Sequence, residues 1–421
     1  MWNTCPVRVL IVTSGSTGDV APYLGIAVRL QSAGHDVTLA THAPFRSLVT
    51  GAGVPFRPIP GDMRAVLPQA RGQDGRGSGT DPRALLKLMS LARPLIRSMA
   101  DGIAAVVESV RPDALLLSTL VAPLGYQLAE AYRIKAAGLF PQPLYPTREF
   151  GSVLVGGRSF GPWGNLAFGH LVDSLAQTMY TRAIRSLRAS LALPDIRLRT
   201  LERAQLSLYP TFYGFSRAVV PRPADWPAQL RISGYWWPAR PRDWQPPAEL
   251  VDFLAAGPPP VHIGFGSMAP GHGSRLTAIV MDAVHRTGVR AILQSGWSGL
   301  ATGPTDDVLS IGDVPHDWLF PQVSAVVHHA GAGTTAAALR AGVPAVPVPV
   351  LADQPFWARR VHHLGAAARP IPMPALTGER LADALLDVRD NPHRAARAQA
   401  LSAQLTAEDA TADLLAWLTA T

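Results

Sequence analysis

Short apolar runs alternate with helix-like segments along the first half of the chain. Residues 7–13 form an almost unbroken apolar and β-branched run, which is typical of a parallel strand buried on both faces. Apolar positions then recur at helical spacing over 22–33, and Gly34 ends that segment. Three more strands are predicted, at 36–41, 114–117 and 136–139. This alternation of strand and helix predicts a doubly wound parallel sheet.

A second series of strand-like runs fills the other half of the chain. Between the two series, over 221–247, the composition shifts to proline and tryptophan, as is common in connections between domains. A chain of 421 residues is also too long for one ordinary core. We therefore predict an N-terminal domain at 1–225 and a second domain at 226–403. The strands predicted in the second domain are 261–265, 291–294, 308–311, 325–327 and 345–348.

The overall composition indicates a globular protein. Hydrophobic residues make up 48 % of the chain and charged residues 16 %, so large buried sheets are expected. The net charge of +8 comes almost entirely from arginine, with Lys87 and Lys135 as the lysines. These arginines are spread along the chain, whereas nucleic-acid binders cluster basic residues on one face, so no nucleic-acid partner is expected. A positive field could recruit an anionic ligand, and a solvated arginine-rich surface explains the charge equally well.

Cysteine usage and the N-terminus bear on the compartment. Cys5 is the only cysteine, which excludes an intramolecular disulfide and a cysteine-based zinc site. The first residues lack the basic region and cleavage site of a signal peptide. No apolar run reaches the length of about 18 residues that spans a bilayer. These features predict a cytoplasmic protein without stable membrane insertion.

The segment HHAGAGTTAAALRAGVPAVPVPVLADQP, from His328 to Pro355, carries the strongest chemical signal. A predicted strand stops at His328 and His329, Gly331 and Gly333 allow a tight turn, and a helix is predicted to begin at Thr334. A helix start presents unpaired N–H groups and the positive end of a dipole, so it favours an anion such as a phosphate. A histidine there adds a donor, which is stronger when the ring is charged. The segment therefore predicts a site for a diphosphate and for a nucleotide.

Each part of this segment also has a purely structural explanation. A histidine at a strand end is often a structural residue, and Gly331 and Gly333 could merely close a turn. Asp353 precedes a predicted helix with Pro355 near its first turn, so it could be only an N-cap. The order of all these features on one strand–helix–strand unit favours the nucleotide site.

The segment resembles the nucleotide-sugar signature of the inverting GT-B glycosyltransferases, in the branch that contains sterol glucosyltransferases and enzymes that glycosylate glycopeptide and polyketide antibiotics. Three other segments agree with this resemblance in the expected order: GSTGDVAPYLGIAVRLQSAGHDVTLAT, PADWPAQLRISGYWW and PPPVHIGFGSM. The resemblance implies an α/β protein of two Rossmann-like, doubly wound parallel-sheet domains that face a cleft. It places the acceptor on the first domain and the donor on the second. It also implies a C-terminal helix, within 404–421, that packs back on the first domain.

The resemblance assigns roles to several donor-site residues. His329 and Thr334 fall at positions that contact the diphosphate, together with the backbone N–H groups of Gly331 to Thr334. Ser267, at the end of another strand, falls near the same group. The leaving group is then neutralised by the helix dipole and side chains, so no metal and no cofactor are expected, and the dTDP- or UDP-sugar donor is a substrate.

Two further contacts hold the rest of the donor. Asp353 and Gln354 match the acidic–glutamine pair that binds donor-sugar hydroxyls, because a carboxylate accepts two protons and an amide both donates and accepts. The nucleobase is expected against the segment that begins at Asp313. An aromatic residue stacks on the base near this position in plant relatives. Here Asp313 takes that place, so the backbone of Val314 is expected to contact the base.

Asp19 is the candidate general base. It follows Gly18 at the tip of the first strand, where the acceptor half of the cleft should open. Many relatives carry a histidine here, oriented by an aspartate on a later strand, whereas this chain has Asp19 and Ser118 at those positions. Two alternatives stay open: Asp19 could only cap the following helix, and Asp353 could serve as the base instead.

The sequence thus predicts an inverting glycosyltransferase, as a monomer or homodimer, that moves a sugar to a hydroxyl of a hydrophobic natural product. Loops at 71–82, 141–147 and 160–163 are candidates for the acceptor pocket. The alternatives are a UDP-glucose-dependent sterol or lipid glucosyltransferase and a non-catalytic nucleotide-sugar-binding partner. A dinucleotide-dependent oxidoreductase is disfavoured because GSTGDV departs from the G-x-G-x-x-G pattern.

Overall fold

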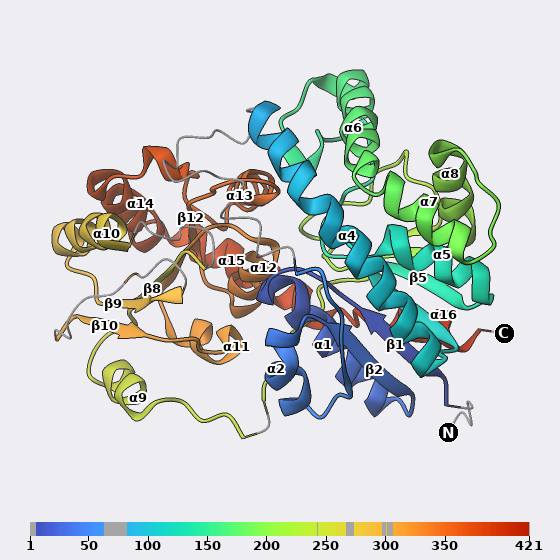
Figure 1. Cartoon of the computed structure of the whole chain (residues 1–421). Helices are drawn as coiled ribbons and strands as arrows, with labels where there is room; N and C mark the ends of the chain where they lie inside the picture. The colour runs from blue at the N-terminus through green and yellow to red at the C-terminus, as the bar shows by residue number, and fades with distance from the viewer. Residues whose placement is uncertain are drawn as a thin grey trace.

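The computed structural model describes residues 6–62, 82–241, 243–266, 273–296, 300 and 306–420. Cys5, residues 71–81 of the predicted loop and Ser267 lie outside these ranges. Two parallel sheets lie side by side, each enclosed by helices (Figure 1). The predicted α/β class is therefore confirmed.

The first sheet has seven parallel strands in the order β3-β2-β1-β4-β5-β6-β7. The strands predicted for this half are confirmed to within one or two residues. The seventh strand follows the boundary predicted after residue 225, so this sheet extends further along the chain than the proline-rich composition indicated. The strands are β1 (Arg8–Val12), β2 (Asp36–Thr41), β3 (Phe56–Pro58), β4 (Ala114–Ser118), β5 (Lys135–Phe140), β6 (Thr211–Tyr213) and β7 (Leu230–Ile232).

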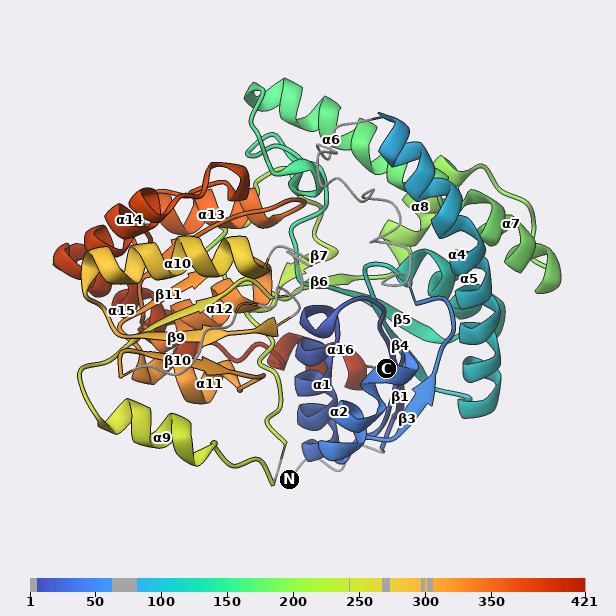
Figure 2. The same cartoon turned by 60° about the vertical axis from the view of Figure 1, so that its left-hand side comes forward.

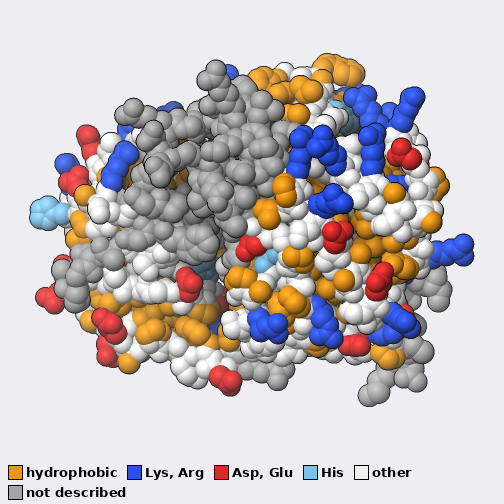
Figure 3. All heavy atoms as spheres, in the orientation of Figure 1, with side chains coloured by type: hydrophobic (Ala, Val, Ile, Leu, Met, Phe, Trp, Pro, Cys, Tyr) orange, Lys and Arg blue, Asp and Glu red, His pale blue; other side chains and the backbone are white. Residues whose placement is uncertain are grey.

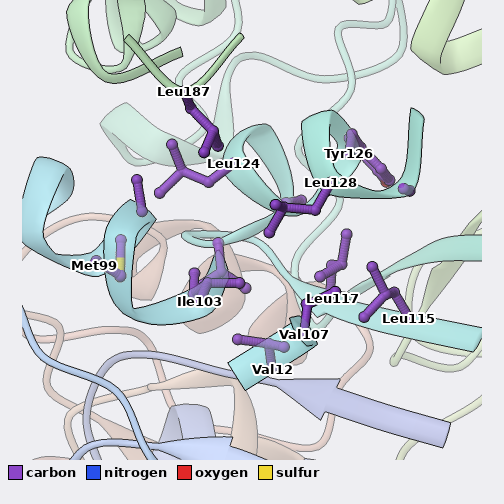
Figure 4. Close-up of a cluster of buried hydrophobic side chains, with 14 of the residues drawn as sticks. Val12, Met99, Ile103, Val107, Leu115, Leu117, Leu124, Tyr126, Leu128 and Leu187 are labelled. Carbon is purple, nitrogen blue, oxygen red and sulfur yellow. The ribbon is translucent and has the colours of Figure 1, made fainter. Parts of the chain in front are cut away.

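Helices cover both faces of the first sheet. Alternate strand residues such as Leu10 and Leu117 pack against α4, α5 and α7 on one face, as Figure 4 shows for part of this cluster. Their neighbours, such as Ile11 and Leu116, pack against α1 and against a helix from the far end of the chain on the other face. The helices of this half are α1 (Thr17–Ser32), α2 (Arg46–Gly51), α4 (Pro82–Val110), α5 (Ala122–Tyr132), α6 (Gly161–Thr178), α7 (Thr181–Ser190) and α8 (Leu198–Leu208), with short 3-10 turns η1 (Ala43–Phe45) and η3 (Val153–Val155).

The helical spacing of apolar residues over 166–189 predicts one long amphipathic helix, and this prediction is wrong, because the segment forms two helices, α6 and α7. The break falls at Met179 and Tyr180, whose N–H groups bond to the carbonyls of Ala176 and Gln177 in a tightened last turn. The hydroxyl of Tyr180 then donates to the carbonyl of Leu120 at 3.0 Å. Tertiary packing of Tyr180 thus ends a helical pattern that the sequence alone continues.

The second sheet has five parallel strands in the order β10-β9-β8-β11-β12. It repeats the central order of the first sheet, and its predicted strands are confirmed. The strands are β8 (Val261–Gly264), β9 (Ala291–Gln294), β10 (Val308–Ile311), β11 (Ala325–His328) and β12 (Ala345–Pro347). The helices are α9 (Ala248–Ala255), α10 (Gly273–Thr287), α11 (His316–Leu319), α12 (Ala332–Ala341), α13 (Gln354–His363), α14 (Gly378–Asp390) and α15 (Pro392–Ala407), with 3-10 turns η5 (Phe320–Gln322) and η6 (Met373–Ala375).

Three features join the halves. The last helix, α16 (Ala412–Thr419), leaves the second half and buries Leu414 and Leu418 in the core of the first sheet. A separate apolar cluster lies between the halves and combines Tyr213 and Phe215 with Trp357 of α13. Helix α1 of the first half contacts α12 of the second, and Figures 1 and 2 show both near the middle of the molecule.

Candidate active site

Each sheet reverses its strand order at one place, and parallel sheets bind ligands at the carboxyl ends of the strands beside such a point. In the first sheet the point lies between β1 and β4, so Asp19 follows one of these strands and Ser118 ends the other. In the second sheet it lies between β8 and β11, and His329 directly follows β11. The chain order of the strands thus brings these predicted residues to the expected edges.

The turn from β11 into α12 is built around His328. The backbone N–H of Ala330 donates to Nδ1 of His328 at 3.0 Å, inside a fully buried pair. Ala330 has a φ of 61°, which an L-residue rarely adopts. The left-handed residue of this turn is therefore Ala330, whereas the sequence pointed to the glycines that follow. The ring of His328 holds the turn because an unprotonated Nδ1 accepts the N–H of Ala330.

His329 explains why position 331 is a glycine. A Cβ at Gly331 would lie 2.5 Å from Nε2 of His329, and one at Gly266 would lie 3.1 Å from Cε1 of the same ring. The φ of Gly331 is −64°, so close approach and not backbone freedom requires the glycine. The ring of His329 is thereby fixed between the ends of β8 and β11, and its Nδ1 has no hydrogen-bond partner within the described part of the chain.

The start of α12 is open to an anion. The helix begins at Ala332, two residues before the predicted start, and Gly331 at the N-cap supplies no capping side chain. Gly333 is exposed, and a Cβ there would meet nothing within 4 Å. Thr334 is partly buried in the same first turn. The first N–H groups of α12 therefore keep their capacity to bind negatively charged oxygens.

Four histidines near this edge are held uncharged. Burial lowers the pKa of His262 to about 3 and of His316 and His329 to about 4, and it lowers the pKa of His328 well below its usual value. Mutual repulsion of their charged forms adds to the effect. His329 is therefore a neutral donor at neutral pH in the free protein. The charge of an incoming diphosphate would favour its protonated form.

Asp353 and Gln354 lie at the start of α13, but their side chains differ from the expected pair. Asp353 occupies the N-cap position, yet its carboxylate caps no N–H group and instead accepts from Nε1 of Trp357 at 2.9 Å. Oε1 of Gln354 accepts from the N–H groups of Val350 and Leu351 at 2.8 and 3.2 Å. The amide oxygen of Gln354 is therefore engaged by the backbone, and its NH₂ group is the part available to a ligand.

Asp19 caps the start of α1, which is one of the two roles considered for it. It is the third residue of α1, and its Oδ2 accepts from the N–H and the hydroxyl of Ser16, both at 2.8 Å, in a capping box. The carboxyl is half-buried, and loss of water raises its pKa, although the two bonds from Ser16 oppose that rise. Such a carboxyl is a stronger base than an exposed aspartate.

Asp19 and Asp353 come from the two halves of the chain, and the charge of Asp19 reaches Asp353. Burial raises the pKa of Asp353 to about 6; the hydrogen bond from Trp357 opposes this, and the negative charge of Asp19 adds to it. A hydrogen bond from the Gln142 side chain, in the loop after β5, also lowers it. The loop after β5, α1 and the start of α13 therefore all act on the carboxyl group of Asp353. Carboxyls with raised pKa values at the junction of two domains are candidates for a catalytic site.

The structure also describes the predicted residues Val314 and Ser118. Val314 is buried between β10 and α11, and Asp313 accepts from Nε2 of Gln294 at 3.4 Å. Ser118 is buried at the end of β4. The structure does not describe Ser267.

Sequence reasoning missed a buried pair beside Asp19. The hydroxyl of Ser14 lies 2.8 Å from Nε2 of His42, and Nδ1 of His42 lies 3.1 Å from the carbonyl oxygen of Ile59. If Nδ1 carries the proton, Ser14 donates to the ring and the loop after β1 is tied to β2 and β3. The signal was a serine and a histidine at the carboxyl ends of two adjacent predicted strands. Gln142 was missed as an individual residue, although its loop was a candidate.

The described residues show neither a metal-binding cluster nor a membrane-spanning helix. They contain no group of three or more His, Cys, Asp or Glu side chains arranged to hold a metal ion. In the same part of the chain, no helix is both long and apolar enough to cross a bilayer.

Family models match both halves of the chain. Residues 9–149 match the glycosyltransferase family 28 N-terminal domain, and residues 279–420 match the C-terminal domain of erythromycin biosynthesis protein CIII-like proteins. These matches cover the edges that carry Asp19 in the first sheet and His329 in the second.

Named relatives align over nearly the whole chain. A sterol 3-β-glucosyltransferase of Arabidopsis thaliana is 35 % identical over 97 % of this chain and 64 % of its own length. The O-mycaminosyltylonolide 6-deoxyallosyltransferase of Streptomyces fradiae is 34 % identical over 96 % of this chain and 94 % of its own. This chain spans less than two thirds of the length of the sterol glucosyltransferases that it matches.

A solved structure has the same fold. The glycosyltransferase SsfS6 of Streptomyces sp. SF2575, complexed with thymidine diphosphate, superposes with a TM-score of 0.64 at 22 % identity and covers 96 % of both chains. The two-sheet arrangement is that of the GT-B glycosyltransferases, which confirms the expected fold. The chain therefore belongs to the glycosyltransferase family that includes the sterol 3-β-glucosyltransferases and the O-mycaminosyltylonolide 6-deoxyallosyltransferase.

Proposed function

We propose that this protein transfers a sugar, with inversion, from a dTDP- or UDP-sugar to a hydroxyl group of a hydrophobic natural product. The observation that carries the proposal is the pair Asp19 and Asp353. One carboxyl comes from α1 in the first half and one from the start of α13 in the second, and the charge of Asp19 raises the pKa of Asp353; both helices contact α12. A donor bound on the second sheet would then present its anomeric carbon to an acceptor on the first.

The general base in this proposal is Asp19. Its carboxylate takes the proton of the acceptor hydroxyl as that oxygen bonds to the anomeric carbon. The bond from the anomeric carbon to the phosphate oxygen breaks at the same time, and the diphosphate leaves with the electron pair. Attack from the side opposite the leaving group gives inversion.

The leaving group is stabilised by the turn after β11. The N–H groups at the start of α12, the Thr334 hydroxyl and His329 face the growing negative charge. Asp353 accepts from the donor-sugar hydroxyls and the amide of Gln354 donates to them. The backbone of Val314 lies against the nucleobase, and Ser267 lies near the diphosphate. This arrangement uses helix dipole and hydrogen bonds instead of a metal.

The acceptor class is supported by the Streptomyces fradiae relative, which is named an O-mycaminosyltylonolide 6-deoxyallosyltransferase. The Arabidopsis relative supports a second candidate, transfer from UDP-glucose to a sterol hydroxyl. The match of residues 279–420 to the C-terminal domain of erythromycin biosynthesis protein CIII-like proteins supports the first candidate.

The test is an assay of the purified protein with dTDP- and UDP-sugars and a panel of macrolide aglycones and sterols, with products identified by mass spectrometry and the anomeric configuration by NMR. An inverted glycoside of a macrolide aglycone supports the proposal, whereas a sterol glucoside from UDP-glucose supports the second candidate. Binding of the nucleotide sugars without any product would indicate a non-catalytic partner.

The role of Asp19 is tested by Asp19→Asn and Asp19→Ala. Asparagine keeps the shape and can still accept from Ser16, so its melting temperature should change little, while loss of the base lowers kcat by roughly 10²–10⁴. Capping alone predicts the reverse: near-normal kcat in Asp19→Asn and a loss of about 1 kcal/mol of stability in Asp19→Ala. Asp353 is the next candidate for the base if Asp19→Asn turns over normally.

A further inference from the structure

Exposed apolar side chains gather on one part of the surface. Among the described residues ten large apolar side chains are exposed, and six of them lie in the short segment 154–175. Trp163 is 72 % exposed and Leu171 is 63 % exposed. We call this set the α6 patch; its members are Leu154, Val155, Phe160, Trp163, Leu171 and Leu175.

The helical part of the α6 patch lies on a single face of α6. Trp163, Leu171 and Leu175 are separated by multiples of four residues, so they form one row along the helix. The opposite face holds α6 to the protein: Gly169 packs on Pro146, and the side-chain NH₂ of Asn165 donates to the carbonyl of Arg148 at 3.1 Å. Figures 1 and 2 show α6 at the outer edge of the molecule. The apolar row therefore points away from the core.

Basic residues border the α6 patch. The guanidinium of Arg148 lies 4.2 Å from the ring centre of Trp163, and that of Arg158 lies 5.8 Å from the ring centre of Phe160. Helix α6 itself has one acidic residue, Asp173, and burial raises the pKa of that carboxyl. Figure 3 shows apolar atoms at the upper edge of the molecule, over α6, with basic side chains beside them. The surface is thus apolar at its centre, and two arginines lie over the aromatic rings at its rim.

We propose that the α6 patch binds the surface of an anionic lipid bilayer. Exposed tryptophan and leucine can enter the boundary between headgroups and acyl chains, while arginines beside them meet lipid phosphates and carboxylates. No described helix is long and apolar enough to span the bilayer, so the contact is peripheral. The two arginines over Trp163 and Phe160 favour a negatively charged surface over a neutral apolar partner.

This inference does not rest on sugar transfer. Its readout is binding to lipid, so failure of the proposed enzymatic function would leave it standing, and failure of lipid binding would leave the enzymatic proposal standing.

The test is sedimentation of the purified full chain with vesicles. One set contains phosphatidylcholine alone and the other equal parts of phosphatidylcholine and phosphatidylserine. The variants are Leu171→Ser with Leu175→Ser, which removes apolar contact, and Arg148→Gln, which removes a rim charge. Leu208→Ser is the matched control, because Leu208 is 69 % exposed on α8, outside the α6 patch. Melting temperatures establish that each variant is folded.

The wild-type chain and Leu208→Ser should sediment with the anionic vesicles and should not sediment with the neutral ones. The double leucine variant should bind at least about tenfold more weakly, which corresponds to about 1.4 kcal/mol. Arg148→Gln should weaken binding less, and added salt should weaken the binding of all of them. Equal binding by the double variant and the wild type would overturn the proposal. So would a wild-type dimer that the double variant converts to monomers with no lipid binding in either, since the α6 patch would then join two copies of the chain.

Discussion

The folded protein disfavours the ionised form of Asp353, and replacing this residue by asparagine removes that charge. The pKa of this half-buried carboxyl rises from an ordinary value of 3.8 to about 6, chiefly because burial takes water from the ionised form. Each pKa unit corresponds to about 1.4 kcal/mol, so the ionised side chain lowers the stability of the fold by about 3 kcal/mol. Asparagine keeps an oxygen that can accept from Trp357, so the bond at 2.9 Å can persist.

The pH dependence follows from the direction of this shift. Between pH ~4 and pH ~6 the folded chain holds the proton of Asp353 and the unfolded chain has lost it, so wild-type stability from this group falls as the pH rises. Asp353→Asn lacks that fall. The stability of the variant should therefore match that of the wild type near pH ~4 and exceed it by about 3 kcal/mol above pH ~7. For a cooperative domain of about 200 residues this corresponds to roughly 10 °C in melting temperature. Comparing the two proteins at each pH cancels the buried histidines, whose lowered pKa values destabilise the fold on acidification.

The measurement is a melting curve of both proteins across this pH range, with an activity assay at each point. Asp409→Asn is a control of opposite sign, because bonds from Thr411 lower the pKa of Asp409 and its loss should destabilise the fold at neutral pH. Activity of Asp353→Asn should fall, since the amide cannot replace a carboxylate toward sugar hydroxyls. A variant that melts below the wild type at pH ~8 would refute the reasoning, because the charge would then be stabilised in the folded chain.

Further predictions concern the turn after β11 and the leaving group. His328→Phe keeps a ring but leaves the N–H of Ala330 unpaired, so it should lower stability by about 1–3 kcal/mol and weaken donor binding, as calorimetry with dTDP and UDP would measure. His329→Ala removes a donor to the diphosphate and should lower kcat/KM by roughly ten- to a hundredfold with the fold intact, whereas unchanged kinetics would make His329 purely structural. Activity should persist in EDTA and gain little from added magnesium; complete loss with recovery on adding metal would contradict stabilisation by the helix and its side chains.

The sequence was sufficient for the strands because they are buried on both faces and read as unbroken apolar runs. The helix at 166–189 was not predictable in the same way. Its apolar spacing continues through Met179, and the break depends on where the hydroxyl of Tyr180 finds the carbonyl of Leu120. A contact sixty residues away in the chain leaves no local signal.

The sequence predicted the positions of the candidate site residues but not their side-chain contacts. Strand ends and helix starts place Asp19 and His329 correctly at the edges of their sheets, because chain order fixes those positions. The detailed roles depend on side-chain contacts that spacing does not encode. The carbonyl oxygen of Gln354 turns back to Val350, and the left-handed residue is Ala330 although two glycines follow it. The link between Gln142 and Asp353 also joins two loops that are far apart in sequence.

The course of α16 bears on the order in which a newly made chain can fold. Synthesis runs from the N-terminus, so Leu414 and Leu418 appear only after every strand of the second sheet has been made. These two side chains complete the same buried cluster as Val9 and Ile11 of the first strand. Part of the core around β1 thus stays exposed to water until α16 is made, whereas the second half can already assemble. The half that leaves the ribosome first should be the last to become resistant to protease, and chaperones that recognise exposed apolar surface should contact it for longest.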